Sequence, residues 1–414
     1  MEGARHRNSA HESSASLVWQ PGRCNGSAPD YSRRIRAVRT SWLLPNRRGP
    51  PASPGGVSMN VLIIGLGYAG QRFRQAFEHV TNRAGVSTSI AYVGRRQKAT
   101  PLRYFACIDS ALQHFTPDIV VVSANDISHA DVLRQLAGYQ GFVVCEKPLA
   151  TPTDALNGVQ DALSGVGGFA LNLIERYSQA TQILREWVAR HGWELVRASF
   201  YWGKDRINDY RPTCGVTSEA IHALDLLRWV CPTAGPLRPD GVLGIRSDFS
   251  VSGLAVLDTV QLTAVLGSAP VTGYSSFVNV VRQRTVDFSF VDWEDQLIHA
   301  RLTFDTPRWD HDHLRIWMRD IDGTELVLHE LRLSPSQSGL ETLHKLSEFC
   351  QQVLDWVVRR QPPPHPFASL DDAVELQELL NQLEHRALTP AAARYNRGAQ
   401  RALLVEGSDL ESLG

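Results

Sequence analysis

A glycine-rich turn between a short apolar run and a helical stretch is the feature of this sequence that most restricts its fold. The turn, Gly65 to Gly70, reads Gly-Leu-Gly-Tyr-Ala-Gly, and it follows Val61 to Ile64 and precedes Gln71 to His79. Between a strand and a helix, such glycines allow a tight turn, close approach of a pyrophosphate and close helix packing. We therefore expect a nucleotide-binding βαβ unit with phosphates at the helix N-terminus.

Short apolar runs alternate with helical stretches as far as about residue 150. This alternation is typical of βαβ units, and strands that are apolar throughout are typical of a parallel sheet buried on both faces. The expected strands after the first are Ser89 to Val93, Ile119 to Ser123 and Phe142 to Cys145. The sequence thus predicts a doubly wound α/β Rossmann domain over residues 59–150, completed by a helix that returns from the C-terminal part.

Beyond residue 150 the pattern changes to a few helices and many alternating strands, which indicates an antiparallel sheet with one exposed face. Helices are expected at 179–190, 218–230, 340–359 and 370–386. Strands are expected at 195–201, 260–265, 271–278, 285–291, 298–304, 314–319 and 325–329. We predict an α+β domain over residues 151–390 with a large, mainly antiparallel open sheet, followed by a flexible tail at 391–414.

Residues 1–58 have a composition that cannot build a core, with nine arginines, three acidic residues and abundant Ser, Pro and Gly. They are interpreted either as a disordered extension or as the result of a mis-assigned start, with translation beginning at Met59.

The overall composition excludes several classes of protein. The 42 basic and 43 acidic residues nearly cancel, so no global field favours nucleic acid or an anionic membrane. No apolar run approaches the roughly 20 residues that span a bilayer. The six cysteines contain no C-x-x-C pair and are interpreted as reduced thiols. We expect a soluble, cytoplasmic protein that acts on a small molecule and needs no metal.

Arg95 and Arg96 follow the second expected strand, where sites that prefer NAD usually carry a carboxylate for the ribose hydroxyls. A guanidinium at this place can pair with a 2′-phosphate through two hydrogen bonds. We predict NADP as cofactor in preference to NAD; the alternative is a pair of solvated loop arginines.

The tripeptide Glu146-Lys147-Pro148 follows the last expected strand of the first domain, at the sheet edge where α/β proteins bind ligands. There the Lys147 ammonium can hydrogen-bond a substrate oxygen. This contact lowers the pKa of the substrate hydroxyl while a hydride leaves the carbon. The alternative is a surface lysine before a proline that opens a helix.

Together, several motifs resemble the glucose-fructose oxidoreductase and inositol dehydrogenase family (Gfo/Idh/MocA) over residues 59–390. They are the glycine turn, Val-Val-Ser-Ala-Asn with the nearby His129, Glu-Lys-Pro, and His222-Ala-Leu-Asp225 in a helix. The resemblance implies an NAD(P)-dependent oxidoreductase that acts on sugars, inositols or nucleotide sugars, as a homodimer or homotetramer assembled through the C-terminal sheet.

The resemblance also implies roles for individual residues. Lys147 and His222 would assist proton transfer, and Asp225, three positions after His222 on the same helix, would orient the imidazole. Arg176 and Tyr177, in a stretch that resembles one in family members acting on nucleotide-linked sugars, would line the substrate cleft or simply pack. The predicted cofactor-binding residues are Gly65, Gly67, Tyr68, Ala69, Gly70, Arg95, Arg96, Ser123, Asn125, Glu146 and Lys147.

The chain departs from the family pattern at the expected catalytic aspartate, where it has Ser218. Glu219 is adjacent, but consecutive helical residues point about 100° apart, so we do not expect it to substitute. Also, Ser123-Ala124-Asn125 replaces the common Thr-Pro-Asn, and His129 comes one residue late.

Two further groups have open interpretations. Asp310-His311-Asp312-His313 is predicted to be a polar strand end or loop in preference to a metal site. The aromatic residues Phe200 to Trp202, followed by Lys204, Asp205 and Arg206, are either a cleft wall or core packing.

We predict hydride transfer between NADP and a carbinol or carbonyl carbon of a sugar-like substrate. The missing aspartate leaves two alternatives open. One is reduction of a C=N bond, as in thiazolinyl imine reductases, and the other is a cofactor-binding regulator without turnover, like the galactose-regulon repressor of yeasts.

Overall fold

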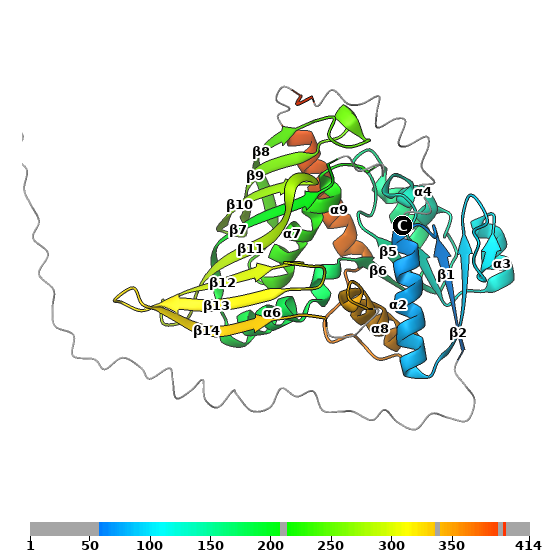
Figure 1. Ribbon diagram of the computed structural model, residues 1–414, viewed down its shortest axis with the longest axis horizontal. Coiled ribbons are helices and arrows are strands. Elements are labelled where there is room, and N and C mark those ends of the chain that lie inside the picture. The colour runs from blue at the N-terminus through cyan, green and yellow to red at the C-terminus, as the bar shows by residue number, and fades with distance from the viewer. Residues whose placement is uncertain (1–57, 208–212, 336–339, 388–391, 395–414) are drawn as a thin grey trace, which may run out of the picture. The chain divides into compact units, whose positions relative to one another are not determined.

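The computed structural model describes residues 58–207, 213–335, 340–387 and 392–394. These residues form two sheets with helices packed against them (Figure 1). The predictions for the N-terminal segment and for the C-terminal tail lie outside the described residues, apart from Ser58 and residues 392–394.

The first sheet has six parallel strands in the order β3-β2-β1-β4-β5-β6. β1 lies at its centre, and the residues before the glycine turn are fully buried because helices cover both faces. This order confirms the predicted Rossmann fold. The strands are β1 (Ser58–Ile64), β2 (Ser87–Val93), β3 (Arg103–Phe105), β4 (Ile119–Val122), β5 (Phe142–Glu146) and β6 (Gly168–Asn172).

β6 lies beyond residue 150, where we expected the second domain to begin. It pairs with β5 along its whole length, so the parallel sheet continues to Asn172. The strand follows α5 (Leu156–Leu163), and the two complete a last βα crossover.

Helix α2 (Tyr68–Ala84) buries Phe73, Phe77 and Val80 against the sheet. Helix α8 (His344–Arg359), from the far end of the sequence, packs beside α2, and the rings of Phe73 and Phe349 lie 6.4 Å apart. The remaining helices of this region are α3 (Ile108–Phe115) and α4 (His129–Arg134), with short 3-10 turns η2 (Asp126–Ser128) and η3 (Ile174–Tyr177).

The second sheet has eight strands in the order β14-β13-β12-β11-β7-β10-β9-β8. Its neighbours are antiparallel except for β7 and β10, which run parallel. This confirms the predicted, mainly antiparallel sheet. The strands are β7 (Glu194–Asp205), β8 (Leu237–Ile245), β9 (Thr259–Leu266), β10 (Ala269–Ser276), β11 (Val278–Val291), β12 (Leu297–Thr303), β13 (His313–Arg319) and β14 (Glu325–Arg332).

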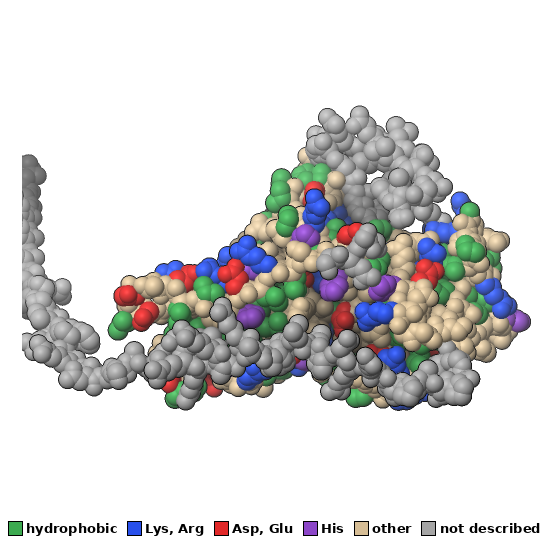
Figure 2. Space-filling view, turned by 60° about the horizontal axis from the view of Figure 1, so that its bottom comes forward, with side chains coloured by type: hydrophobic (Ala, Val, Ile, Leu, Met, Phe, Trp, Pro, Cys, Tyr) green, Lys and Arg blue, Asp and Glu red, His purple; other side chains and the backbone are tan. Residues whose placement is uncertain are grey.

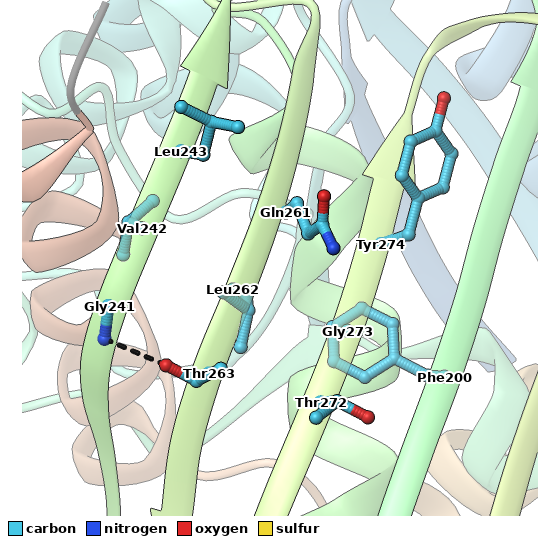
Figure 3. Close-up of a pocket in the computed structure, with 10 residues that line it drawn as sticks. All are labelled: Phe200, Gly241, Val242, Leu243, Gln261, Leu262, Thr263, Thr272, Gly273 and Tyr274. Atoms are coloured by element: carbon cyan, nitrogen blue, oxygen red, sulfur yellow. Dashed lines mark hydrogen bonds between the residues drawn. The ribbon is translucent and has the colours of Figure 1, made fainter. Parts of the chain in front are cut away.

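Three helices pack on one face of this sheet: α6 (Gln179–His191), α7 (Thr217–Val230) and α9 (Leu370–Arg386) (Figure 1). The 3-10 turn η4 (Gly253–Ala255) precedes β9. On the opposite face, side chains such as Leu243, Gln261 and Tyr274 stand on the strands and border a hollow of about 610 Å³ (Figure 3).

Three expectations about these elements were wrong in detail. The run 271–278 is not one strand, because the chain leaves β10 at Ser276 and enters β11 at Val278. β8 was not expected, since Pro239 and Gly241 interrupt its alternation; the structure accommodates them at a bulge on an edge strand. α8 begins at His344, four residues later than predicted.

The described helices include none that is long and apolar enough to cross a membrane. Figure 2 shows basic and acidic side chains interspersed on one face of the molecule, in agreement with the near-neutral net charge.

Candidate active site

The glycine turn has the geometry that a pyrophosphate requires. Gly65 has a φ of 94°, and a Cβ there would lie 2.6 Å from the Cα of Ala124; a Cβ on Gly70 would overlap the carbonyl of Gly65. A Cβ on Gly67, by contrast, would meet no atom within 4 Å. The first and third glycines are therefore needed for packing, whereas the second faces open space.

The N-terminus of α2 completes this cradle. Gly67 provides no side-chain cap, and the first turn carries no acidic residue, so the helix amides are not neutralised by a carboxylate. Tyr68 is exposed at the rim. The first amides of a helix and the positive end of its dipole favour a phosphate group, so these residues fit a dinucleotide.

Arg95 and Arg96 are exposed in the loop after β2, and neither has a hydrogen bond or ion pair with another described residue. Close by, the Lys98 Nζ donates to the carbonyl of Leu66 at 2.7 Å. The loop with the two arginines is thus tied to the glycine turn.

The loops after β4 and β5 are held together by buried polar contacts. The Ser123 hydroxyl donates to the carbonyl of Gly65 at 2.9 Å. The ring nitrogens of His129 lie 2.6 Å from the Pro148 carbonyl and 3.1 Å from the Ala124 carbonyl. His129 therefore fixes the loop that carries Lys147, which is a positioning role that the sequence did not reveal.

Two predicted cofactor residues are engaged with the protein itself. The Asn125 side chain accepts from the Ile127 amide at 3.1 Å, and the Glu146 carboxylate accepts from the Asn172 amide group at 2.7 Å. Both contacts shape the sheet edge beside Lys147.

Lys147 meets the second domain at the N-terminus of α7. Its Nζ donates to the Ser218 carbonyl at 2.5 Å and to Glu219 Oε1 at 3.1 Å. The Lys204 Nζ, from the end of β7, donates to the same oxygen at 2.7 Å. The carboxylate that the sequence interpretation set aside is therefore the one beside Lys147, because α7 begins just before it and Glu219 faces β7.

The charges in this group affect one another strongly. Burial alone would raise the pKa of Glu219, but Lys147, Lys204 and Arg284 outweigh it, and the pKa lies well below the usual range. Burial, and then the charge of Lys147, hold the pKa of His222 well below its usual range. Glu219 is thus ionised and His222 neutral near neutral pH.

His222 lies one turn further along α7, stacked on Trp202 with 5.6 Å between ring centroids and 24° between planes. Its Nδ1 is buried and has no hydrogen-bond partner among the described residues. Trp202 and Phe200 are both buried in the hydrophobic core, so core packing is the one of the two interpretations that these aromatic residues meet.

Asp225 does not orient the His222 ring in this structure. Its two oxygens accept from Arg176 Nε at 2.8 Å and from Nη2 at 2.5 Å, and both side chains are buried. A bidentate guanidinium is a stronger partner for a carboxylate than a neutral imidazole, so Asp225 turns away from His222.

Arg176 and Tyr177 lie away from Lys147. Arg176 borders a hollow of about 590 Å³ with Trp229 and residues of α9. Tyr177 packs in the core with its ring 4.9 Å from that of Phe349. Both therefore have structural partners, which is the packing alternative of the sequence interpretation.

The Asp310 to His313 segment belongs to a different cluster. The Lys345 Nζ donates to Glu175 at 2.6 Å and Asp305 at 3.1 Å, and lies 3.7 Å from Asp310 and 3.4 Å from Asp312. The two aspartates of the motif thus face a buried ammonium. Among the described residues, no group of three or more His, Cys, Asp or Glu side chains is arranged to hold a metal ion.

One contact that the sequence did not predict links the loop after β4 to the segment before α7. Asp126, just after β4, accepts from the Thr213 hydroxyl at 3.1 Å and from the Cys214 amide at 3.0 Å. The Thr213 and Ser218 hydroxyls are 3.2 Å apart. Ser218, in place of an aspartate, thus helps to join the two domains.

Comparison with known proteins agrees with this architecture. Residues 59–170 match the model GFO_IDH_MocA, described as an oxidoreductase family with an NAD-binding Rossmann fold. The search of the curated proteins gave no match.

Solved structures match most of the described chain. An oxidoreductase domain protein from Kribbella flavida is 16% identical with a TM-score of 0.65, over 80% of this chain and 97% of that one. Myo-inositol 2-dehydrogenase from Lactobacillus plantarum is 15% identical with a TM-score of 0.58, over 80% and 97%. The transcriptional regulator Gal80p from Kluyveromyces lactis is 12% identical with a TM-score of 0.62, over 81% and 91%. At these identities the likeness concerns the fold.

Proposed function

We propose that the chain is an NAD(P)-dependent oxidoreductase of a sugar-like substrate, because residues 59–170 match the model of an oxidoreductase family with an NAD-binding Rossmann fold. The observation that carries the proposal is the Lys147 ammonium, held 3.1 Å from Glu219 Oε1 at the sheet edge where the glycine turn also lies. The bound nicotinamide supplies or accepts a hydride at a carbinol or carbonyl carbon of the substrate.

In this proposal Lys147, Glu219 and His222 have separate roles in the reaction. The Lys147 ammonium hydrogen-bonds the substrate oxygen and stabilises its negative charge as the hydroxyl proton leaves. Glu219 holds the Lys147 side chain in place through their hydrogen bond. His222, neutral because of its lowered pKa, accepts the hydroxyl proton during oxidation and returns it during reduction. Asp225 and Arg176 support α7 from its other side and are not catalytic.

The test is binding of NADPH and NADH, measured by fluorescence or calorimetry, followed by turnover with sugars, sugar acids, nucleotide sugars and cyclic imines. Lys147→Met should lower kcat by roughly 10²- to 10⁴-fold, the usual contribution of a positioned acid or base. Cofactor binding should remain. Full turnover by this variant would sink the mechanism, and absence of any nicotinamide nucleotide binding would sink the whole proposal.

We further propose a preference for NADP over NAD. Arg95 and Arg96 support it, because both guanidinium groups are exposed beside the glycine turn and have no partner among the described residues. Arg95→Ala should weaken NADPH binding and leave NADH binding nearly unchanged. Equal affinities for the two nucleotides in the unchanged protein would contradict the preference.

A regulator without turnover is the second candidate, favoured by the likeness to Gal80p. The two candidates differ in one measurement. Nucleotide binding without oxidation or reduction of any panel member supports the regulator, whereas turnover that depends on Lys147 supports the enzyme.

We also propose that the open face of the second sheet joins two copies of the chain. Leu243 is 47% exposed beside the hollow in Figure 3, and Val196 and Leu297 are also exposed on this sheet. Leu243→Glu should convert an oligomer to a monomer in sedimentation equilibrium. A monomeric unchanged protein would refute this assembly.

A further inference from the structure

Lysine is rare in this chain. Of the 42 basic residues only four are lysines, namely Lys98, Lys147, Lys204 and Lys345. Lys98 is tied to the glycine turn, Lys147 has a task in the proposed reaction, and Lys345 is enclosed by four carboxylates. Lys204 has no role in the proposed reaction, although it contacts the same carboxylate as Lys147.

Lys204 and Lys147 share one carboxylate oxygen. Glu219 Oε1 lies 2.7 Å from the Lys204 Nζ and 3.1 Å from the Lys147 Nζ. Arg284 is bound by Asp305 and lies 3.8 Å from Glu219 Oε2. Two ammonium groups thus meet a single carboxylate, so among these three side chains the positive charges outnumber the negative ones.

An excess charge in a partly buried cleft is costly unless it is paired or neutralised. The Lys204 and Lys147 side chains are 17% and 16% exposed, so both ammonium groups remain within reach of a ligand. Each ammonium has three N–H donors. Among the described residues, Lys204 uses one of them, on Glu219.

A second cation extends the same wall. Arg282 is two residues before Arg284 on β11, so both project from one face of the sheet. The Arg282 guanidinium stacks over Trp309 at 4.2 Å, and its Nε is buried with no hydrogen-bond partner among the described residues. β7 and β11 therefore both carry a cation with N–H donors on the side where Lys147 lies, Lys204 on β7 and Arg282 on β11.

We propose that Lys204 binds an anionic group of the substrate, so that the substrate of this oxidoreductase is an acid, carrying a carboxylate or a phosphate beside the carbinol or carbonyl carbon that reacts. The inference rests on the proposed function and defines its substrate class. Lys147 then acts on the reacting oxygen, and Lys204 selects and orients the molecule through its charge.

Binding of the acid is coupled to protonation of Lys204. In the free protein, burial lowers the pKa of Lys204 well below its usual range; Glu219 opposes the effect, and Arg206 and Lys147 add to it. A bound anion raises that pKa again. At a pH where the Lys204 amine is neutral in the free protein, binding of the acid therefore takes up a proton. The affinity for the acid then falls as the pH rises.

The test compares matched ligands on the protein loaded with NADP: glucose against glucuronate, which differ by one carboxylate, and glucose 6-phosphate as the phosphate arm. Binding is measured by calorimetry in two buffers of different ionisation enthalpy. We expect at least one acid to bind roughly 10- to 100-fold more tightly than glucose, the contribution of one or two hydrogen bonds to a charged group. Glucuronate and glucose 6-phosphate then distinguish a carboxylate from a phosphate.

Two variants make the test specific. Lys204→Met should remove the preference for the acid, and Lys204→Arg should keep the preference but lose the proton uptake, because a guanidinium stays charged. Arg319→Met, at the end of β13, removes the same charge elsewhere and should change neither result. Thermal unfolding and NADPH binding show whether each variant is folded.

The proposal is overturned if glucose binds as tightly as both acids, if neither acid binds, or if Lys204→Met keeps the preference. These results leave the oxidoreductase proposal standing as long as NADPH binds and some neutral substrate is turned over with the help of Lys147. Absence of nucleotide binding, by contrast, refutes the oxidoreductase proposal and not the charge argument for the cleft.

Discussion

Two buried clusters of charge in this protein use lysine in opposite ways. In the cleft, two ammonium groups meet one carboxylate, that of Glu219, and both lysine side chains keep some exposure. Beneath it, the single ammonium of Lys345 is 4% exposed and meets the carboxylates of four residues on two segments of chain. Arg284 lies between the clusters, bound by Asp305 and close to Glu219.

This difference in the balance of charge distinguishes a cluster that can bind a ligand from one that stabilises the fold. The lower cluster has a surplus of acceptors and links η3, the loop after β12 and α8, so it fixes the helix that returns to the Rossmann domain. The cleft cluster has a surplus of donors that a ligand can use. Burial and charge alone therefore do not mark a functional site; the sign of the surplus and the access to solvent do.

The largest expected effect is on stability, in the lower cluster. Lys345→Met leaves four buried carboxylates without their ammonium, and removing one partner of a buried pair costs about 3 to 5 kcal/mol. Denaturant unfolding measures this loss. Lys204→Met, the matched change in the cleft, should cost much less because it relieves a surplus. Equal losses of unfolding free energy for the two variants would contradict the proposed difference between the clusters.

The next effect concerns pH. Burial raises the pKa of Glu175 from 4.5 to about 7, although Lys345 opposes it. Below pH 4.5 the carboxyl is protonated in both states. Between pH 4.5 and about 7 the unfolded chain loses this proton and the folded chain keeps it, so the unfolding free energy falls with rising pH. At roughly 1.4 kcal/mol per pH unit the fall is about 3 kcal/mol.

The measurement is the unfolding free energy of the unchanged protein and of Glu175→Gln at several pH values. Glutamine does not titrate, so the variant should lack this fall, and the difference between the two curves isolates Glu175. Parallel curves from pH 4.5 to 7 would show that Glu175 titrates normally.

A somewhat smaller effect is expected on catalysis, in the cleft. Glu219→Gln removes the charge that holds Lys147 in place, and we expect kcat to fall roughly 10²-fold, about 2.7 kcal/mol of transition-state stabilisation. The pH–rate profile should also shift, since the two ammonium groups then repel each other without a carboxylate between them. Asp225→Asn is the control on the same helix, and its pH–rate profile should not shift. A shifted pH–rate profile for Asp225→Asn would instead indicate that Asp225 orients His222.

The smallest effect is expected for an exposed pair outside both clusters. Arg301 and Asp287 form a bidentate ion pair across β12 and β11, 2.6 and 3.0 Å between their atoms, at the surface. Arg301→Ala should change the unfolding free energy by no more than about 1 kcal/mol, because water screens such pairs. A loss comparable to that of Lys345→Met would mean that burial does not account for the difference between the clusters.

Much of the fold was readable from local patterns. The glycine turn, the apolar strands and the position of Lys147 after β5 depend on neighbouring residues, and the structure has them where the sequence predicts. The return of α8 to the first domain was also expected. The extension of the parallel sheet to β6 was missed, because residues 168–172 gave no signal that distinguished them from the strands that follow.

The sequence by itself determined that the glycine turn and Lys147 lie at the same edge of the parallel sheet. Each follows the carboxyl end of a strand, and in a parallel sheet built from βαβ units these ends share one edge. Only the tertiary structure decided which carboxylate faces that lysine. Glu219 and Asp225 project from different sides of α7 because of the helical period, and the packing of distant segments brings Lys204 to the first and Arg176 to the second. Periodicity along a helix shows which residues share a face, and only packing shows what that face meets.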